Sequence, residues 1–301
     1  MSPTVADQLR AVFEQDPNLP TLPDHVRRIM ALIGDEDVSF QELAEEVKKD
    51  PALALRVLRL ANSAAYHQTT EITSLERAFA VIGMHQLAAV LSGVATMGRC
   101  EKFLDDPRFE WARFWEHSSG TAFIACSLAE RLGLQFEGAE FLAGLLHDIG
   151  YLALARFGKV RFRTAVRRAA EQNGFLAREL EALFGISVDE AGLILAEVSQ
   201  LADSIQLVIR HHRDPGRAPP EFQPLVCVVS LANQMAHLCG LTFFRGTADV
   251  EVVIEELPAW KLLVERHPQM ARWDVARVVF DLEREYLATQ DFVRNVQEPA
   301  D

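Results

Sequence analysis

Segments with helical periodicity follow one another along most of the chain, and they constrain the fold more than any other feature. In these segments apolar residues recur three and four positions apart, as they do on the buried face of an amphipathic helix. The predicted helices include residues 111–132, 138–149, 160–173, 177–184, 188–200, 203–212, 225–240 and 273–288. The short segment 251–257 is compatible with either a helix or a strand. The sequence therefore predicts an all-α protein.

The polar stretch 101–110 (EKFLDDPRFE) is the best candidate for a domain boundary, because it contains an Asp-Asp-Pro breaker. A chain of 301 residues also exceeds the usual size of a single hydrophobic core, so about two lobes are expected. The predicted parts are an N-terminal helical lobe, residues 1–105, a second helical lobe, residues 106–290, and a C-terminal tail, residues 291–301.

Charge and cysteine spacing narrow the classes of function. The formal net charge of −13 opposes nucleic-acid binding, which needs a basic surface. The cysteines Cys100, Cys126, Cys227 and Cys239 lack CxxC spacing, which favours a reducing cytoplasm over a disulfide framework. The uncharged stretch 78–98 is long enough to span a bilayer, but its polar residues and glycines favour a buried helix pair. We therefore expect a cytoplasmic protein that does not bind a membrane.

A histidine and an aspartate, His147 and Asp148, are adjacent where an apolar helix is expected to end. Burial of either side chain without a partner disfavours its charged form, so a partner is expected. Neutral imidazole and carboxylate are ordinary ligands of divalent metals, although a hydrogen-bond network would also satisfy them. Further histidines on predicted helices, His117 and the pair His211-His212, are candidates to complete such a site.

Several stretches occur in a characteristic order along the chain. They are Leu22-Pro23, the ends of segment 50–63 (DPAL and RLANS), 74–78 (SLERA) with Ile82-Gly83, 115–118 (WEHS), 144–150 (GLLHDIG) and His211-His212. Together they resemble the HD-related output domain (HDOD) family, a branch of the HD superfamily of metal-dependent phosphohydrolases. The resemblance covers nearly the whole chain. It implies an N-terminal helical lobe packed on an HD-like helical core, and a role in bacterial signal transduction.

The resemblance also implies a metal site. In catalytic relatives the residues that match His117, His147 and Asp148 hold one metal with a late aspartate, and further histidines help to hold a second one. Two metals together activate water and stabilise the oxygens of a phosphoester displacement. In this chain Val188 aligns with the extra histidine and has no ligand atom, and Asn233 aligns with the late aspartate. An amide oxygen is a weaker, neutral donor, so a two-metal hydrolase is not expected.

The remaining residues are compatible with one divalent metal (Fe, Mn, Ni or Zn) or with no metal. Candidate ligands are His117, His147, Asp148, His211, His212 and Asn233. Adjacent residues on a helix point about 100° apart, so commonly only one histidine of such a pair faces a site. The alternative is that the His-Asp pair belongs to a hydrogen-bond network where helices meet.

A second candidate site is basic. Arg156, Lys159, Arg163 and Arg167 recur at intervals of about one helical turn, and this face could receive an anionic ligand or an acidic partner. A solvated helix face with local ion pairs is the simpler explanation.

Together these features predict a regulatory HDOD protein of bacterial signal transduction. We expect it to act by binding a signalling protein or a small anionic ligand, and we assign no catalytic residue. The alternative is a metal-dependent phosphohydrolase or phosphodiesterase that uses His117, His147, Asp148, His211 and His212.

Overall fold

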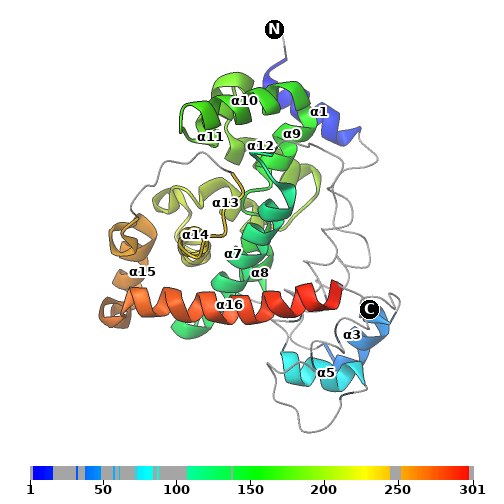
Figure 1. The fold of residues 1–301 in the computed structure, drawn as a ribbon, viewed down its shortest axis with the longest axis vertical. Coiled ribbons are helices and arrows are strands. Elements are labelled where there is room, and N and C mark those ends of the chain that lie inside the picture. The colour runs from blue at the N-terminus through cyan, green and yellow to red at the C-terminus, as the bar shows by residue number, and fades with distance from the viewer. Residues whose placement is uncertain are drawn as a thin grey trace.

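Every regular element in the described part of the chain is a helix (Figure 1). The computed structural model describes residues 3–15, 32, 38–48, 57, 61, 72, 74–83, 87, 107–136, 138–244 and 252–297, with side chains of the last range up to residue 286. An isolated backbone bridge pairs Phe109 with Phe244. The prediction of an all-α fold is confirmed.

The described helices fall into an N-terminal group and a longer second group. The N-terminal ones are α1 (Val5–Glu14), α3 (Phe40–Val47) and α5 (Leu75–Ile82). The others are α7 (Trp111–Leu132), α8 (Ala139–Leu146), α9 (Gly150–Phe157), α10 (Lys159–Glu171), α11 (Leu176–Phe184), α12 (Val188–Val198), α13 (Asp203–His211), α14 (Gln223–Leu238), α15 (Pro258–Arg266) and α16 (Val275–Gln297). Short 3-10 helices are η2 (Pro215–Arg217), η3 (Ile254–Glu256) and η4 (Pro268–Arg272).

Most predicted segments match these helices to within a few residues. The exceptions are α16, which extends beyond residue 288, and α1, α9 and α15, which lie outside the predicted segments. The ambiguous segment 251–257 contains the 3-10 helix η3. In α9 (GYLALARF) every residue from 150 to 155 is buried, so the helix shows no alternation of apolar and polar faces that could be recognised in sequence.

The buried apolar side chains form two clusters. The larger contains residues of α7 to α16, and Leu9 and Phe13 of α1 also belong to it. The smaller includes Leu43 of α3 and Phe79 of α5, two helices that contact each other at one end of the molecule (Figure 1). The division at residues 105 and 106 stays a prediction, because residues 88–106 lie outside the described part. Helix α1 packs on α12 of the larger cluster.

Of the described helices, none combines the length and the apolar character needed to cross a membrane. The helix pair predicted at 78–98 lies mostly outside the described residues.

Two glycines allow the helices around His147 and Asp148 to approach their neighbours closely. A Cβ atom on Gly144 of α8 would lie 2.6 Å from the Cα atom of Ala122 in α7. A Cβ atom on Gly150, the first residue of α9, would overlap the backbone carbonyl of Val188 in α12. A backbone cannot turn aside as a flexible side chain can, so only glycine permits this packing. The His-Asp pair is thereby held between α7 and α12.

Candidate metal site and adjoining pocket

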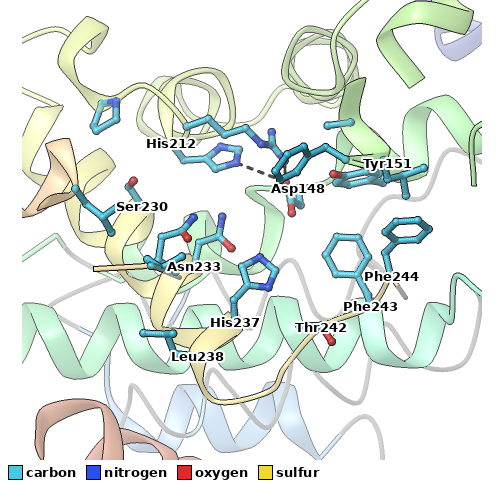
Figure 2. Close-up of a pocket in the computed structure, with 18 of the residues that line it drawn as sticks. Asp148, Tyr151, His212, Ser230, Asn233, His237, Leu238, Thr242, Phe243 and Phe244 are labelled. Atoms are coloured by element: carbon cyan, nitrogen blue, oxygen red, sulfur yellow. Dashed lines mark hydrogen bonds and ion pairs between the residues drawn. The ribbon is translucent and has the colours of Figure 1, made fainter. Parts of the chain in front are cut away.

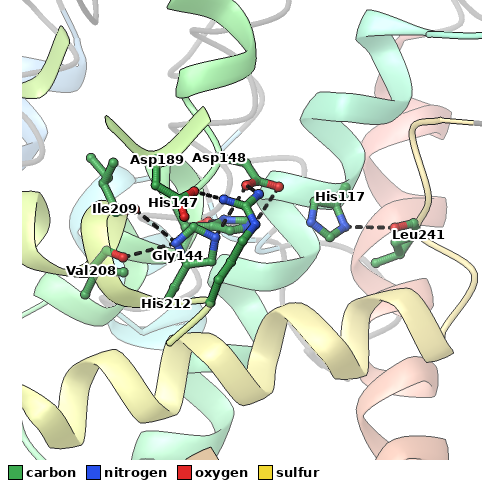
Figure 3. A network of polar contacts seen from close by, with 10 residues as sticks. His117, Gly144, His147, Asp148, Asp189, Val208, Ile209, His212 and Leu241 are labelled. Carbon is green, nitrogen blue, oxygen red and sulfur yellow. Dashed lines mark hydrogen bonds and ion pairs between the residues drawn. The ribbon is translucent and has the colours of Figure 1, made fainter. Parts of the chain in front are cut away.

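Three potential metal ligands, His117, His147 and Asp148, come together among the helices of the larger cluster (Figure 3). His117 lies in the middle of α7, His147 follows the last residue of α8, and Asp148 lies between α8 and α9. All three are buried, and one ligand atom of each lies within 4.8 Å of the others. This cluster could bind a divalent metal.

Backbone carbonyls orient the first two histidines. The Nδ1 atom of His117 lies 2.8 Å from the carbonyl oxygen of Leu241, and the Nδ1 atom of His147 lies 2.6 Å from that of Gly144 (Figure 3). A carbonyl only accepts hydrogen bonds, so each Nδ1 carries the proton and each Nε2 presents a lone pair. Both Nε2 atoms are buried without a hydrogen-bond partner. Histidines that bind metals in proteins are oriented in the same way.

Of the adjacent histidines at the end of α13, the structure brings His212 to the cluster and leaves His211 on a partly exposed side of the helix. The Nδ1 atom of His212 lies 3.1 Å from the carbonyl oxygen of Val208 and 3.2 Å from that of Ile209. Its Nε2 atom lies 3.5 Å from Oδ1 of Asp148. His212 therefore adds a third buried imidazole whose Nε2 faces the carboxylate, next to the three ligands above.

Asp148 is an anion surrounded by basic groups. Its Oδ2 atom lies 3.4 Å from Nε2 of His147, and the guanidinium of Arg213 donates a hydrogen bond to Oδ1. Burial by itself raises the pKa of the Asp148 carboxyl group, and the positive charge of Arg213 is the strongest influence that lowers it. The pKa of Asp148 therefore lies well below its usual value.

Arg213 is a functional candidate that the sequence analysis missed. Its guanidinium forms ion pairs with both Asp148 and Asp189, a residue in the first turn of α12, and it donates a hydrogen bond to the hydroxyl of Tyr151. Burial lowers the pKa of Arg213, but the charge of Asp148 and the hydrogen bonds outweigh burial, so the pKa stays raised. The one signal in the sequence was its position directly after His211-His212.

The two positions that depart from the family pattern lie next to the cluster. Val188 is buried at the start of α12, where its carbonyl contacts the backbone of Gly150. Asn233 of α14 is also buried, and its Oδ1 atom has no hydrogen-bond partner. One turn further along α14, His237 stacks on His117, a contact that the sequence did not reveal. Within the described residues, one group of potential metal ligands forms.

A pocket of about 680 Å³ opens beside the cluster (Figure 2). Its polar lining includes Asp148, His212, Arg213, Asn233 and His237. Its apolar lining includes Tyr151, Leu176, Leu238, Phe243 and Phe244. Sites for small molecules typically have volumes of about 300–1,000 Å³ and a few polar groups on a largely apolar wall. The pocket therefore has the size and lining of a ligand site.

The predicted basic face lies on α10 and the residues before it. Lys159, Arg163 and Arg167 are exposed and Arg156 is half-buried, while Phe162 on the opposite side of α10 is buried. None of the four basic residues is among those that line the pocket. Binding of an anion to this face stays a prediction.

Comparisons with known proteins agree on one family. The profile of the HDOD domain matches residues 19–215. A solved HDOD domain protein of unknown function from Geobacter sulfurreducens is 29% identical, with a TM-score of 0.79 over 97% of each chain. A curated, uncharacterised protein from Treponema pallidum is 26% identical over 74% of this chain, which spans 43% of that protein.

Two further solved structures share the fold at lower identity. A protein from Shewanella amazonensis, provisionally assigned as a phosphohydrolase, is 22% identical with a TM-score of 0.66, and the match covers 98% of this chain and 99% of that one. A protein from Marinobacter aquaeolei, provisionally assigned to signal transduction, is 20% identical with a TM-score of 0.65. That match covers 98% of this chain and 61% of the Marinobacter protein.

Proposed function

The chain belongs to the HDOD domain family, and from this premise we propose that it is a regulatory protein that acts by binding and does not hydrolyse phosphoesters. The observation that carries the proposal is the single group of metal ligands in the described residues, His117, His147 and Asp148. Hydrolysis by a two-metal site requires ligands for two ions that hold both the attacking and the leaving oxygen.

The surroundings of the cluster support this proposal. Val188 presents an apolar side chain and its backbone carbonyl towards Gly150, and neither offers the imidazole expected at this position. Asn233 offers only a neutral amide oxygen, which neutralises less metal charge than a carboxylate would. A second divalent ion would therefore lack both a strong ligand and a compensating charge.

A single metal fits the residues that are present. His117, His147 and Asp148 would hold it, with His212 beside them, and imidazole nitrogen with carboxylate oxygen suits Fe, Mn, Ni or Zn. The three unpartnered Nε2 atoms support this fit, since a buried lone pair without a donor or a metal is costly. When bound, the metal would supply a Lewis acid and would join α7 to the segment between α8 and α9.

We propose a signalling protein or a small anionic ligand as the partner, in the cytoplasm. The likeness in fold to the Marinobacter protein provisionally assigned to signal transduction motivates the first choice. The exposed basic face with Lys159, Arg163 and Arg167 is the proposed contact for an acidic partner.

The second candidate function is metal-dependent phosphohydrolysis. It is favoured by the buried, preoriented imidazoles of His117, His147 and His212, which have the orientation that a catalytic metal would need. This function would use Asp148 as the anionic ligand.

An assay of metal-loaded protein distinguishes the two functions. Protein loaded with Mn²⁺ or Fe²⁺ is incubated with nucleoside monophosphates, bis(p-nitrophenyl) phosphate and cyclic dinucleotides, beside the variant Asp148→Ala under identical conditions. We expect no hydrolysis above the level of the variant. Hydrolysis by the wild type that disappears in Asp148→Ala would establish the enzyme and refute the regulatory proposal.

A further inference from the structure

We infer that Arg213 and a divalent metal compete for Asp148. In one state the carboxylate binds the guanidinium, and in the other it binds the metal. The inference rests on the proposed regulatory function, because it describes how that site would respond to a signal.

The first state is the one in the structure. The guanidinium of Arg213 lies between two carboxylates from different elements, Asp148 before α9 and Asp189 in α12, and it also binds the hydroxyl of Tyr151. Arginine is a permanent cation with a planar fork of donors that suits carboxylates. The chain thus supplies, from its own side chain, the positive charge that a metal would bring to Asp148.

Competition follows from the shared carboxylate. Oδ1 of Asp148 accepts the hydrogen bond from Arg213, and Oδ2 of the same carboxylate lies 3.4 Å from Nε2 of His147. A metal held by this carboxylate and by His117 and His147 would lie next to the guanidinium, inside a region where water screens poorly. Two cations in such a place disfavour each other, so the metal binds well only when Arg213 leaves Asp148.

The surroundings of Arg213 allow its guanidinium to move away from Asp148. Its side chain is 33% exposed, and Asp189 remains available as a partner at 23% exposure. The side chain also lines the pocket of about 680 Å³. Along the chain, Arg213 lies between His212 and the 3-10 helix η2. Displacement of the guanidinium would therefore change the charge on the pocket wall, so a ligand in the pocket and a metal in the cluster would influence each other's affinity equally.

Isothermal titration calorimetry with Ni²⁺ and with Mn²⁺ tests the competition. The wild type is compared with Arg213→Gln, which removes the charge, and with Arg213→Lys, which keeps it. Arg217→Gln is the matched control, because Arg217 is 80% exposed and pairs only locally with Asp214. We expect the dissociation constant of Arg213→Gln to fall by about tenfold or more, since removal of a neighbouring charge shifts such equilibria by about one to three powers of ten.

The other variants test whether the charge of Arg213 and the buried cluster account for the gain in affinity. Arg213→Lys should stay within a few-fold of the wild type, and so should Arg217→Gln. The gain in Arg213→Gln should disappear when His117→Ala is added, because the gained metal must occupy the buried cluster and not the partly exposed His211. Equal affinities of wild type and Arg213→Gln, or a gain that survives His117→Ala, would overturn the inference.

If Arg213→Gln does not fold, the competition is tested on the wild type instead. Phenylglyoxal modifies arginines that are free of ion pairs, and mass spectrometry reads the modification at Arg213 and Arg217 separately. Saturating Ni²⁺ should accelerate the reaction at Arg213 and leave Arg217 unchanged. An unchanged rate at Arg213 would contradict the competition. Phosphoester hydrolysis by the metal-loaded wild type would contradict the proposed function instead, and would leave the competition standing.

Discussion

The imidazole of His237 stacks on the imidazole of His117, with ring centroids 4.5 Å apart and an angle of 28° between the ring planes. Burial lowers the pKa of both rings. Positive charge on His237 or His147 would lower the pKa of His117 further; at His237 the charge of Asp148 opposes burial, while those of His147 and Arg213 add to it. Both rings are therefore neutral in the folded protein at neutral pH, which keeps the Nε2 lone pair of His117 available.

The first prediction concerns the stability of metal-free protein in acid. In the unfolded chain His117 and His237 take up protons near pH 6.5, whereas in the folded protein they do so only at lower pH. The unfolded state therefore binds more protons below about pH 6.5, and stability falls as the pH drops through that value, by up to about 1.4 kcal/mol per pH unit and per histidine. Urea unfolding in EDTA between pH 8 and pH 5 measures this slope. A stability that rises on acidification to pH 5 would contradict the neutral pair.

The second prediction concerns Gly144. A Cβ atom there would lie 2.6 Å from the Cα atom of Ala122, so Gly144→Ala must push α8 away from α7. Such overpacking typically costs about 1–3 kcal/mol in the free energy of unfolding. Gly174→Ala is the matched control, since its Cβ atom would have no neighbour nearer than 3.9 Å. Urea denaturation should show a large loss for the first variant only; equal stabilities would mean that the two helices are not in close contact.

The third prediction concerns Leu146, which is 5% exposed at the end of α8. Leu146→Ala should cost about 2–5 kcal/mol, because it leaves a cavity in the core next to the His-Asp pair. Val160→Ala, at a residue that is 79% exposed, should change the stability by less than about 0.5 kcal/mol. Thermal and urea unfolding of both variants provide the measurement. A loss below about 1 kcal/mol for Leu146→Ala would place this side chain outside the core.

The fourth prediction concerns thiol reactivity. Burial raises the pKa of Cys227 to about 12 and that of Cys239 to about 11. Only the thiolate is nucleophilic, so iodoacetamide at pH 8 should label both residues slowly in the folded protein and quickly in urea. Peptide mapping by mass spectrometry follows each cysteine. Labelling of Cys227 at equal rates in the presence and absence of urea would contradict its burial in α14.

The local pattern predicted most helices because their own residues determine them. Trp111–Leu132 was predicted with the bounds that α7 has, since its apolar positions are regularly spaced and Gly133 ends the helix in a left-handed conformation. Helix α9 could not be predicted in this way, because its residues 150–155 are all buried and leave no polar face to mark a helical period. It packs against α10 and α12, and the residue pattern within α9 does not reveal these contacts.

From the sequence alone, helical periodicity predicted the all-α fold, ordered motifs indicated the family, and the resemblance to that family implied that His117, His147 and Asp148 belong to one site. The tertiary structure alone decided that His212 faces the cluster instead of His211, that Arg213 bridges Asp148 and Asp189, and that His237 stacks on His117. These contacts depend on how each helix is rotated about its axis and on where the chain turns after α13. Rotation and turn are set by packing between helices that are far apart in sequence, where a change of one residue redirects a side chain by about 100°.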